Sequence, residues 1–403
     1  MIEGPRSRRA ERHARAQRRR RNTAVGGCAL LLAVAGSVYV AYGRGGGSGA
    51  TAADRLPGGG PATTAQDDAK AGGKQPGKPS PGVKKAARPP EPAGTLTLAF
   101  AGDVHFTDRT APRLGVDPAL GPMSAALSAA DFSMVNLETA ITSRGVAQPK
   151  KYHFRTTPAA LGALQRSGID AVTMANNHAV DYGAQGLTDS LAAKHSSPIP
   201  VVGIGADESE AYRPFTTTVN GVRLAVVAAS QVIDITNQNW RATATHPGIA
   251  SALDRPKLLK AVRDAKAHAD VVVVYLHWGT EGQNCPGPEQ KSIAADLSAA
   301  GATAVVGTHA HVMLGSGMMG RTYVAYGFGN FLWYGHSPYP NSDETGVTSL
   351  TVTHGKVTKA AFTPAVVDGN GVPEPQSGAA ATRITDRYAQ LRQCTGLADP
   401  PRG

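Results

Sequence analysis

The sequence predicts an α/β fold, and three observations lead to that prediction. From about residue 95 onward, short apolar runs rich in β-branched residues alternate with helix-like segments, a pattern typical of sheets that are at least partly parallel. Nearly every apolar run is followed directly by residues that carry imidazole, carboxylate or amide groups. The residues before position 95 have almost no large apolar side chains outside one short stretch, so they are not expected to form a core.

Eight apolar runs are predicted to be strands: Leu96–Ala101, Phe132–Leu137, Ala171–Met174, Val201–Ile204, Leu224–Ala228, Val271–Leu276, Ala304–Gly307 and Thr322–Tyr326. Helices are predicted between them at Pro158–Ser167, Gly186–His195, Pro256–His268 and Glu289–Ala300. A hairpin is predicted from Thr348–Thr353 and Lys356–Phe362. We expect one domain over residues 95–372 and a peripheral C-terminal extension, 373–403, with a helix near Ile384–Gln393.

The N-terminal region predicts a membrane anchor. Residues 1–22 form a basic tail, and Arg18–Arg21 run directly into an uncharged apolar stretch from Ala24 to Tyr42. That stretch is close to the roughly 20 residues that a membrane-spanning helix needs. The basic residues on its N-terminal side predict a single-pass anchor over residues 23–43, with the N-terminus inside and the folded domain outside the cell membrane. The alternative is a cleaved signal peptide, but the run ends without a small-residue cleavage site.

Residues 44–94 are mainly Gly, Pro, Ala and Lys, and they predict a disordered linker. The formal net charge of the chain is +11, and counting by segment assigns all of it to residues 1–22 and 43–95. Residues 96–403 are therefore formally neutral. A neutral domain gives no electrostatic reason to expect a nucleic-acid partner, and we predict none.

The polar residues after the strands predict a metal site. Asp103 and His105, Glu138, Asn177 and His178, His277, and His309 and His311 each follow a different predicted strand. Ligand sites in open α/β sheets gather at the carboxyl ends of the strands, so these side chains are expected to converge. Imidazole and carboxylate ligands without thiolate suit Mn, Fe or Zn. The Asp-x-His pair and the His-x-His pair, together with a bridging carboxylate, would hold one or two such ions.

Six segments in this order resemble the CapA (poly-γ-glutamate capsule biosynthesis) family. They are Gly102-Asp103, Asn136-Leu137-Glu138, Ala175-Asn176-Asn177-His178, His277-Trp278-Gly279-x-Glu281, Gly307-Thr308-His309-Ala310-His311 and Tyr326-Gly327-Phe328-Gly329-Asn330-Phe331. Each is short, but their order and spacing extend over nearly all of residues 95–370. The family in turn resembles the calcineurin-like metallophosphoesterases. This resemblance implies a four-layer α/β/β/α sandwich of the metallophosphoesterase type with metals at its edge, preceded here by the transmembrane helix and disordered linker.

The resemblance also implies roles for individual residues. Asp103 and His105 match the first Asp-x-His metal pair, and His277, His309 and His311 match later ligands. Glu138 stands where the wider superfamily has a bridging Asp. Asn177 would bind metal, and His178 would act on the leaving group or the transition state. Arg155 would either bind an anionic group of the substrate or be an ordinary surface arginine. Two departures are the longer Glu138 and Ala179, which stands where phosphoesterases usually have Glu.

Two questions stay open at the level of sequence. Cys285 and Cys394 either form a disulfide in an oxidising compartment or remain free thiols. The function is either CapA-type work on poly-γ-glutamate or a related anionic envelope polymer, by hydrolysis or within a synthesis and export complex, or that of a stand-alone phosphoesterase acting on an envelope phosphoester. A non-catalytic polymer-binding scaffold is the third alternative.

Overall fold

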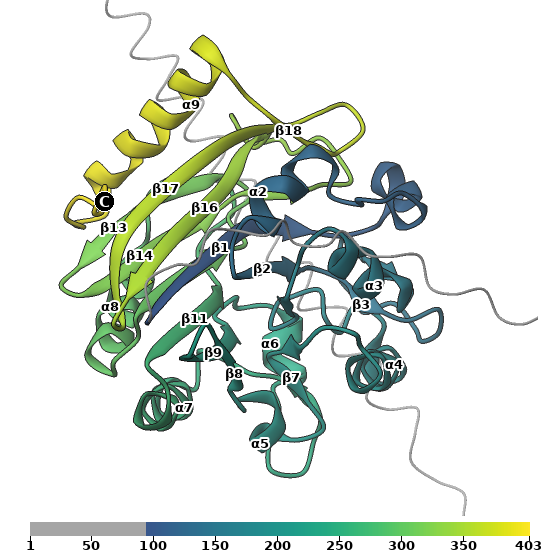
Figure 1. The fold of residues 1–403 in the computed structure, drawn as a ribbon. Helices are drawn as coiled ribbons and strands as arrows, with labels where there is room; N and C mark the ends of the chain where they lie inside the picture. Colours follow the sequence, from purple (N-terminus) through teal and green to yellow (C-terminus); the bar gives the residue numbers. More distant parts are fainter. Residues whose placement is uncertain (1–93) are drawn as a thin grey trace, which may run out of the picture. The chain divides into compact units, whose positions relative to one another are not determined.

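A computed structural model describes residues 94–403 of the chain (Figure 1). The predicted tail, anchor and all but the last residue of the predicted linker therefore lie outside the described residues. Within the described part, no helix combines the length and the apolar character that crossing a bilayer requires.

The larger of two main sheets has eight strands in the order β18-β17-β16-β1-β2-β5-β6, with β15 beside β1. The strands β1, β2, β5 and β6 run parallel to one another, whereas β16, β17 and β18 are antiparallel. Their bounds are β1 Thr95–Val104, β2 Phe132–Leu137, β5 Ala171–Thr173, β6 Val201–Val202, β15 Asn330–Leu332, β16 Glu344–Thr353, β17 Lys356–Val367 and β18 Pro373–Pro375.

The second sheet has six strands in the order β13-β14-β12-β11-β9-β8. Its central strands β14, β12, β11 and β9 are parallel, and β13 and β8 are antiparallel edges. The bounds are β8 Phe215–Val219, β9 Val222–Ser230, β11 Val271–His277, β12 Ala304–Thr308, β13 Met313–Met319 and β14 Thr322–Phe328. Two short pairs complete the strands, β3 Ala140–Ile141 with β4 Arg155–Thr156, and β7 Ile204–Gly205 with β10 Gly248–Ile249.

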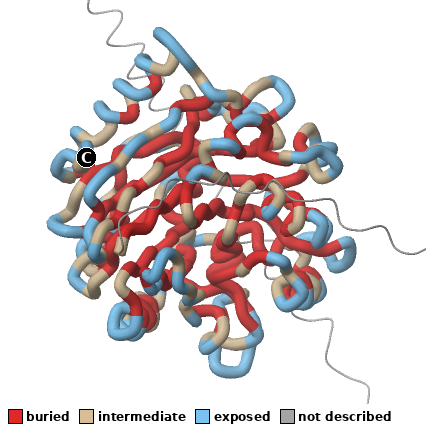
Figure 2. Tube along the Cα trace, in the orientation of Figure 1, coloured by how far each residue is buried: buried red, intermediate tan, exposed pale blue. Residues whose placement is uncertain are grey.

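Helices cover the outer face of each sheet, and the two sheets pack on each other. The helices α3 (Ala159–Arg166) and α4 (Gly183–His195) share a core with the larger sheet, and α7 (Arg255–His268) and α8 (Pro288–Ala299) share one with the smaller. A third core lies between the sheets and includes Phe100, Val273 and Tyr323. Figure 2 shows that the buried chain is concentrated in the interior of the folded domain. These mixed α/β sheets are consistent with the metallophosphoesterase-like sandwich that the sequence predicts.

Local sequence explains where the main helices begin. The Asp254 side chain accepts a hydrogen bond from the Lys257 N–H and caps α7, whose first turn also contains Pro256. Pro288 is the first residue of α8, where its missing N–H costs no hydrogen bond. Three shorter helices lie in the connections, α2 Ser124–Ser128, α5 Glu208–Ala211 and α6 Ile235–Asn239, with 3₁₀ turns η1 Asp108–Gly115, η2 Gly121–Met123 and η3 Arg392–Cys394.

Besides edge strands that the sequence does not predict, β8 and β13 among them, two predicted elements differ notably from the structure. The predicted strand Val201–Ile204 is divided between β6 and β7 by Gly203, which has a φ of 86° and lies so close to Ala175 that a Cβ would be 2.4 Å from that methyl group. The predicted C-terminal helix begins earlier, because α9 spans Gly378–Leu391. It buries Ile384 and Tyr388 against β13 and β17.

Gly102 is required by the close approach of β1 to the segment after β14. A Cβ at Gly102 would lie 1.8 Å from the Gly329 carbonyl oxygen, and that same carbonyl accepts a hydrogen bond from the Asp103 N–H at 3.0 Å. We expect Gly102→Ala to lower the free energy of unfolding by about 3 kcal/mol, because backbone must move to admit the methyl group. Urea unfolding measures the loss. Gly115→Ala is the control, since nothing lies within 4 Å of its Cβ position, and an equal loss in both variants would contradict the close-packing argument.

Candidate metal centre

The predicted ligands converge where the carboxyl ends of the parallel strands of both sheets meet. From the larger sheet, Asp103 lies near the end of β1, Glu138 follows β2, and Asn177 and His178 follow β5. From the smaller sheet, His277 is the last residue of β11, and His309 and His311 follow β12. The centre therefore lies between two sheets rather than at the edge of one.

Two groups of side chains have the spacing that a metal ion needs. The ligand atoms of Asp103, Glu138 and His277 all lie within 4.8 Å of one another, and so do those of Glu138, His309 and His311. Glu138 belongs to both groups. If both groups held an ion, this carboxylate would be available to both ions.

Buried polar atoms without partners support a fit to divalent cations. Both carboxylate oxygens of Glu138 and both ring nitrogens of His105 are buried without a hydrogen-bond partner, and both side chains are fully buried. Leaving such groups unsatisfied is costly, so native proteins seldom do it without a ligand or a functional reason. The donor set of imidazole and carboxylate suits Mn, Fe or Zn.

The pKa shifts at the centre also agree with a site for divalent cations. Burial, and next the charge of Asp103, raises the pKa of Glu138 well above its usual range. Burial likewise holds the pKa of His105 and His309 well below the usual value and lowers that of His277 to about 4. Neutral imidazoles are the metal-binding form, and two neighbouring buried carboxylates favour a cation between them.

Asp103 and His311 differ from the other predicted ligands, because the pKa of each favours the charged form of its side chain. Burial alone would raise the pKa of Asp103 and lower that of His311, but the pairing between these two side chains reverses both shifts. The pKa of His311 is raised to about 9, and that of Asp103 falls below its usual range. The His311 Nδ1 lies 3.6 Å from Asp103 Oδ2, which is an ion-pair distance rather than a hydrogen bond.

Neighbouring side chains hold the ligands in orientation. The Asn136 amide donates to Asp103 Oδ1 at 2.8 Å, and the strand register places these two residues side by side on β2 and β1. Thr308 lies opposite His277 on β12, with its hydroxyl 3.0 Å from the His277 Nδ1. The Asn330 Oδ1 lies 3.0 Å from His311 Nδ1. The motifs quoted above contain all three residues, but sequence analysis gave them no role.

The backbone of the His-x-His segment is strained. His309 has a φ of 98° and His311 a φ of 56°, values that residues with a side chain seldom adopt. Such strain persists only where the surrounding structure imposes it, and it is concentrated at functional sites. The turn aims both imidazoles back toward the centre, with the His309 Nδ1 3.2 Å from the His277 Nε2.

Asn177 and His178 enter the centre from the loop after β5. The Asn177 Oδ1 lies 2.8 Å from the His277 Nε2. The His178 Nδ1 lies 2.7 Å from the Asp181 Oδ2, and its Nε2 lies 3.8 Å from Glu138 Oε1. Burial first of all lowers the pKa of His178 well below its usual value. Sequence analysis missed Asp181, although the spacing His-x-x-Asp within one loop was a usable signal.

Aromatic side chains enclose His105. Its ring lies 4.6 Å from the ring centroid of Phe154 and 4.6 Å from that of Trp333, and Tyr334 lies at 4.8 Å. The Arg109 guanidinium holds this wall in place by donating to the carbonyl oxygens of Trp333 and Gly335. His105 is thereby fixed in an environment with low polarity.

Two further predictions concern Arg155 and the two cysteines. Arg155, the predicted substrate clamp, is exposed, and its guanidinium carbon lies 4.3 Å from the Tyr182 ring centroid. Cys285 and Cys394 are joined by a disulfide with an S–S distance of 2.08 Å. This bond connects the loop between β11 and α8 to the segment after α9.

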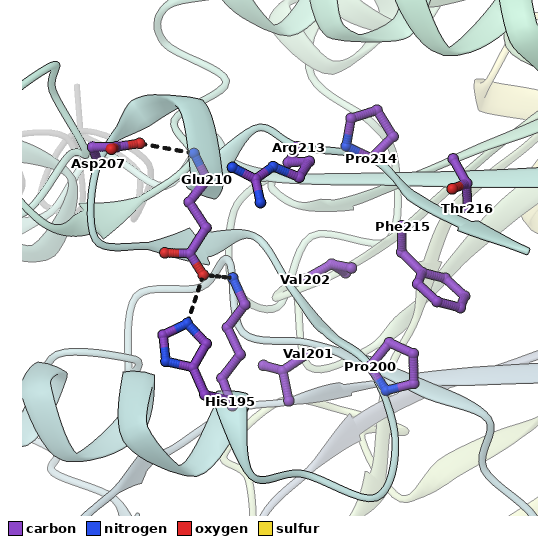
Figure 3. Close-up of a pocket in the computed structure, with 11 residues that line it drawn as sticks. His195, Pro200, Val201, Val202, Asp207, Glu210, Arg213, Pro214, Phe215 and Thr216 are labelled. Carbon is purple, nitrogen blue, oxygen red and sulfur yellow. Dashed lines mark hydrogen bonds and ion pairs between the residues drawn. The ribbon is translucent and has the colours of Figure 1, made fainter.

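A cavity of about 650 Å³ lies away from the centre, beside the edge strands β6 and β8. Figure 3 shows Glu210 reaching His195, with Val201, Val202 and Phe215 in the wall. Lys194 also pairs with Glu210, at 2.6 Å, so these charges compensate one another. None of the predicted ligands lines this cavity.

Comparisons with known proteins agree with the resemblance in the motifs. The PGA biosynthesis protein CapA of Bacillus subtilis (strain 168) is 30% identical over 244 residues, which are 59% of this chain and 63% of that protein. The capsule biosynthesis protein CapA of Bacillus anthracis is 29% identical over 249 residues, 59% of this chain and 60% of that protein. The chain thus spans less than two thirds of the length of these curated relatives.

Solved structures with a similar arrangement are more distant in sequence. A phosphatase from Mycoplasma pneumoniae is 14% identical with a TM-score of 0.42, covering 74% of this chain and 99% of that one. A hypothetical protein from Thermus thermophilus is 17% identical with a TM-score of 0.42, covering 67% of this chain and 98% of that one.

The family match covers the metal centre. Residues 97–334 match the family described as bacterial capsule synthesis protein PGA_cap, and this range contains every predicted ligand from Asp103 to His311. Because the match extends over more than half of the chain, this protein belongs to the PGA_cap family of bacterial capsule synthesis proteins.

Proposed function

We propose that this protein is a metal-dependent hydrolase of the cell envelope that acts on poly-γ-glutamate or a related anionic polymer. The observation that carries the proposal is Glu138, a fully buried carboxylate without hydrogen-bond partners that belongs to both ligand groups. A purely structural or polymer-binding surface has no need for such a group. When bound here, one or two divalent ions would supply an activated water and a positive charge for the developing oxyanion.

The protein's own residues would do the remaining work. The metal would be held by one group of side chains: Asp103, His105, Glu138, His277, His309 and His311. Asn177 would reach the metal from the loop after β5. The His178 Nε2 faces the centre, where it can accept a proton from the attacking water and pass that proton to the leaving group as the scissile bond breaks. Asp181 orients that imidazole through its Nδ1.

The test is metal analysis of the full-length protein, followed by assays on γ-glutamyl, aryl phosphate and phosphodiester substrates. Bound metal together with cleavage of γ-glutamyl substrates is the expected result. Cleavage of phosphoesters alone would favour a stand-alone envelope phosphoesterase. If no metal binds and Mn or Zn restores no activity, both hydrolytic functions fail and a polymer-binding scaffold, alone or with a synthesis and export complex, replaces them.

The proposed location is the outer side of the cell membrane, with the chain anchored by residues 23–43. The support is the Arg18–Arg21 block before the apolar run and the Cys285–Cys394 bond, since disulfides persist mainly in oxidising compartments. Protease treatment of protoplasts, in which the cell wall has been removed and the cell membrane is intact, should digest the folded domain. Protection of the domain, with digestion only after lysis, would overturn this location.

A further inference from the structure

Lys150 is a largely buried cation that the proposed reaction has not yet used. Its side chain is 13% exposed, and its Nζ lies 2.6 Å from the Asp181 Oδ1 and 2.6 Å from the Asn177 carbonyl oxygen. The next residue, Lys151, is exposed and lies over the Tyr152 ring. Burying an ammonium group is costly unless it is paired, so the pairing of Lys150 calls for a reason.

The partner of Lys150 connects it to the centre. The Asp181 side chain is fully buried, and its two oxygens have different partners. Oδ1 faces Lys150, whereas Oδ2 lies 2.7 Å from the His178 Nδ1 and accepts a hydrogen bond from the Phe154 N–H at 2.6 Å. A chain of contacts therefore runs from Lys150 through Asp181 to the imidazole whose other nitrogen faces Glu138.

The loop that carries Lys150 is itself fixed against the same structure. Gln148 donates its N–H to the Asp181 carbonyl oxygen at 2.9 Å, and its side-chain oxygen accepts from the Trp240 Nε1 at 3.2 Å. Asp234 lies 4.0 Å from the Lys150 Nζ and adds a second negative charge. The contacts of Gln148 thus fix the loop, and the two carboxylates of Asp181 and Asp234 fix the ammonium group of Lys150.

We propose that Lys150 is a positioning residue of the metal centre, whose ammonium group holds the Asp181 carboxylate and the Asn177 main chain so that His178 and Asn177 point inward. This inference rests on the proposed function. Without the cation, Asp181 would be a buried carboxylate facing one neutral imidazole, and it would turn away or bind a proton. In either case the His178 ring would lose its fixed orientation.

The first test is kinetic and uses Lys150→Met, with Lys151→Met as the matched control. We expect Lys150→Met to lower kcat about 10- to 100-fold with KM little changed, which is the usual effect of removing a partner that orients a site residue. Lys150→Arg should recover part of the rate because it restores the positive charge. Equal kcat values for the Lys150→Met and Lys151→Met proteins would overturn the proposal.

The second test does not need catalysis. Nitrogen-15 NMR of histidine-labelled full-length protein, with His178→Gln to assign the signal, reports which ring nitrogen of His178 carries the proton. We expect one tautomer with hydrogen on Nδ1 in the wild type and a mixture in Lys150→Met, or in Lys150→Gln should the Met variant not fold. An unchanged His178 spectrum would overturn the positioning role, whereas absence of hydrolysis by the wild type would overturn only the proposed function.

Discussion

Glu138→Gln is expected to abolish metal binding and yet to make the metal-free protein more stable. The wild-type carboxylate is fully buried with no hydrogen-bond partner for either oxygen, and Asp103 lies near it. Gln has nearly the same shape without the charge, so the metal-free variant should gain about 1–3 kcal/mol in the free energy of unfolding. Because Glu138 belongs to both ligand groups, its loss should weaken binding of every ion at the centre by more than about 100-fold.

Titration calorimetry with Mn and Zn measures the affinity, and urea unfolding in the presence of a chelator measures the stability. His268→Ala is the control, because His268 lies exposed in the last turn of α7. Asp103→Ala and His309→Ala should each weaken binding as well, since each belongs to one ligand group. Undiminished affinity in Glu138→Gln would show that the two groups do not share this carboxylate.

The second large effect should come from reducing the Cys285–Cys394 bond. The two cysteines are 109 residues apart, and closing a loop of that length restricts the unfolded chain strongly. The chain-entropy argument gives a loss of about 4–5 kcal/mol in the free energy of unfolding when the bond is absent. Urea unfolding with and without dithiothreitol measures this loss.

The double variant Cys285→Ser/Cys394→Ser provides the control for reductant. Its unfolding should match that of the reduced wild type and should not respond to dithiothreitol. The bond also tethers the loop between β11 and α8 at Cys285. In that loop the Gly282 N–H donates to the carbonyl oxygen of Ala310, the middle residue of the His-x-His segment. If the oxidised and reduced wild types unfold at the same urea concentration, the loop is held by its other contacts alone.

Strands and most helices followed from sequence because their signals are local. Phe132–Leu137 is apolar, short and bounded by polar residues, and the structure has β2 at those residues. The edge strands β8 and β13 have weaker patterns: β8 is the partly exposed stretch Phe-Thr-Thr-Thr-Val, and β13 is interrupted by Gly315 and Gly317. Edge strands pair on one side only, so their sequences carry less of the apolar signal.

The grouping of Asp103, Glu138, His277, His309 and His311 followed from sequence, because these residues lie at or directly after the carboxyl ends of strands that meet. The meeting of two sheets did not follow from the residues themselves, since the order of strands within and between sheets depends on tertiary packing. Only the family resemblance implied two packed sheets. Lys150 gave no signal at all, because its neighbour Lys151 is chemically identical and only the loop geometry distinguishes a buried ammonium from an exposed one. The role of Asn330 could not be predicted from sequence either, because its contact with His311 joins strand β15 to the loop after β12 and depends on tertiary packing.

The division of the centre between two sheets has a consequence for the order of events during synthesis. The ligands Asp103 and Glu138 are made early, and His309 and His311 follow only after most of the domain has been made. A growing chain that ends before β11 can complete neither ligand group, and one that ends before β12 still lacks both members of the His-x-His pair. Metal capture by this centre would therefore be a late event that only a nearly finished domain could perform, and the ion content of the protein would report on completed assembly.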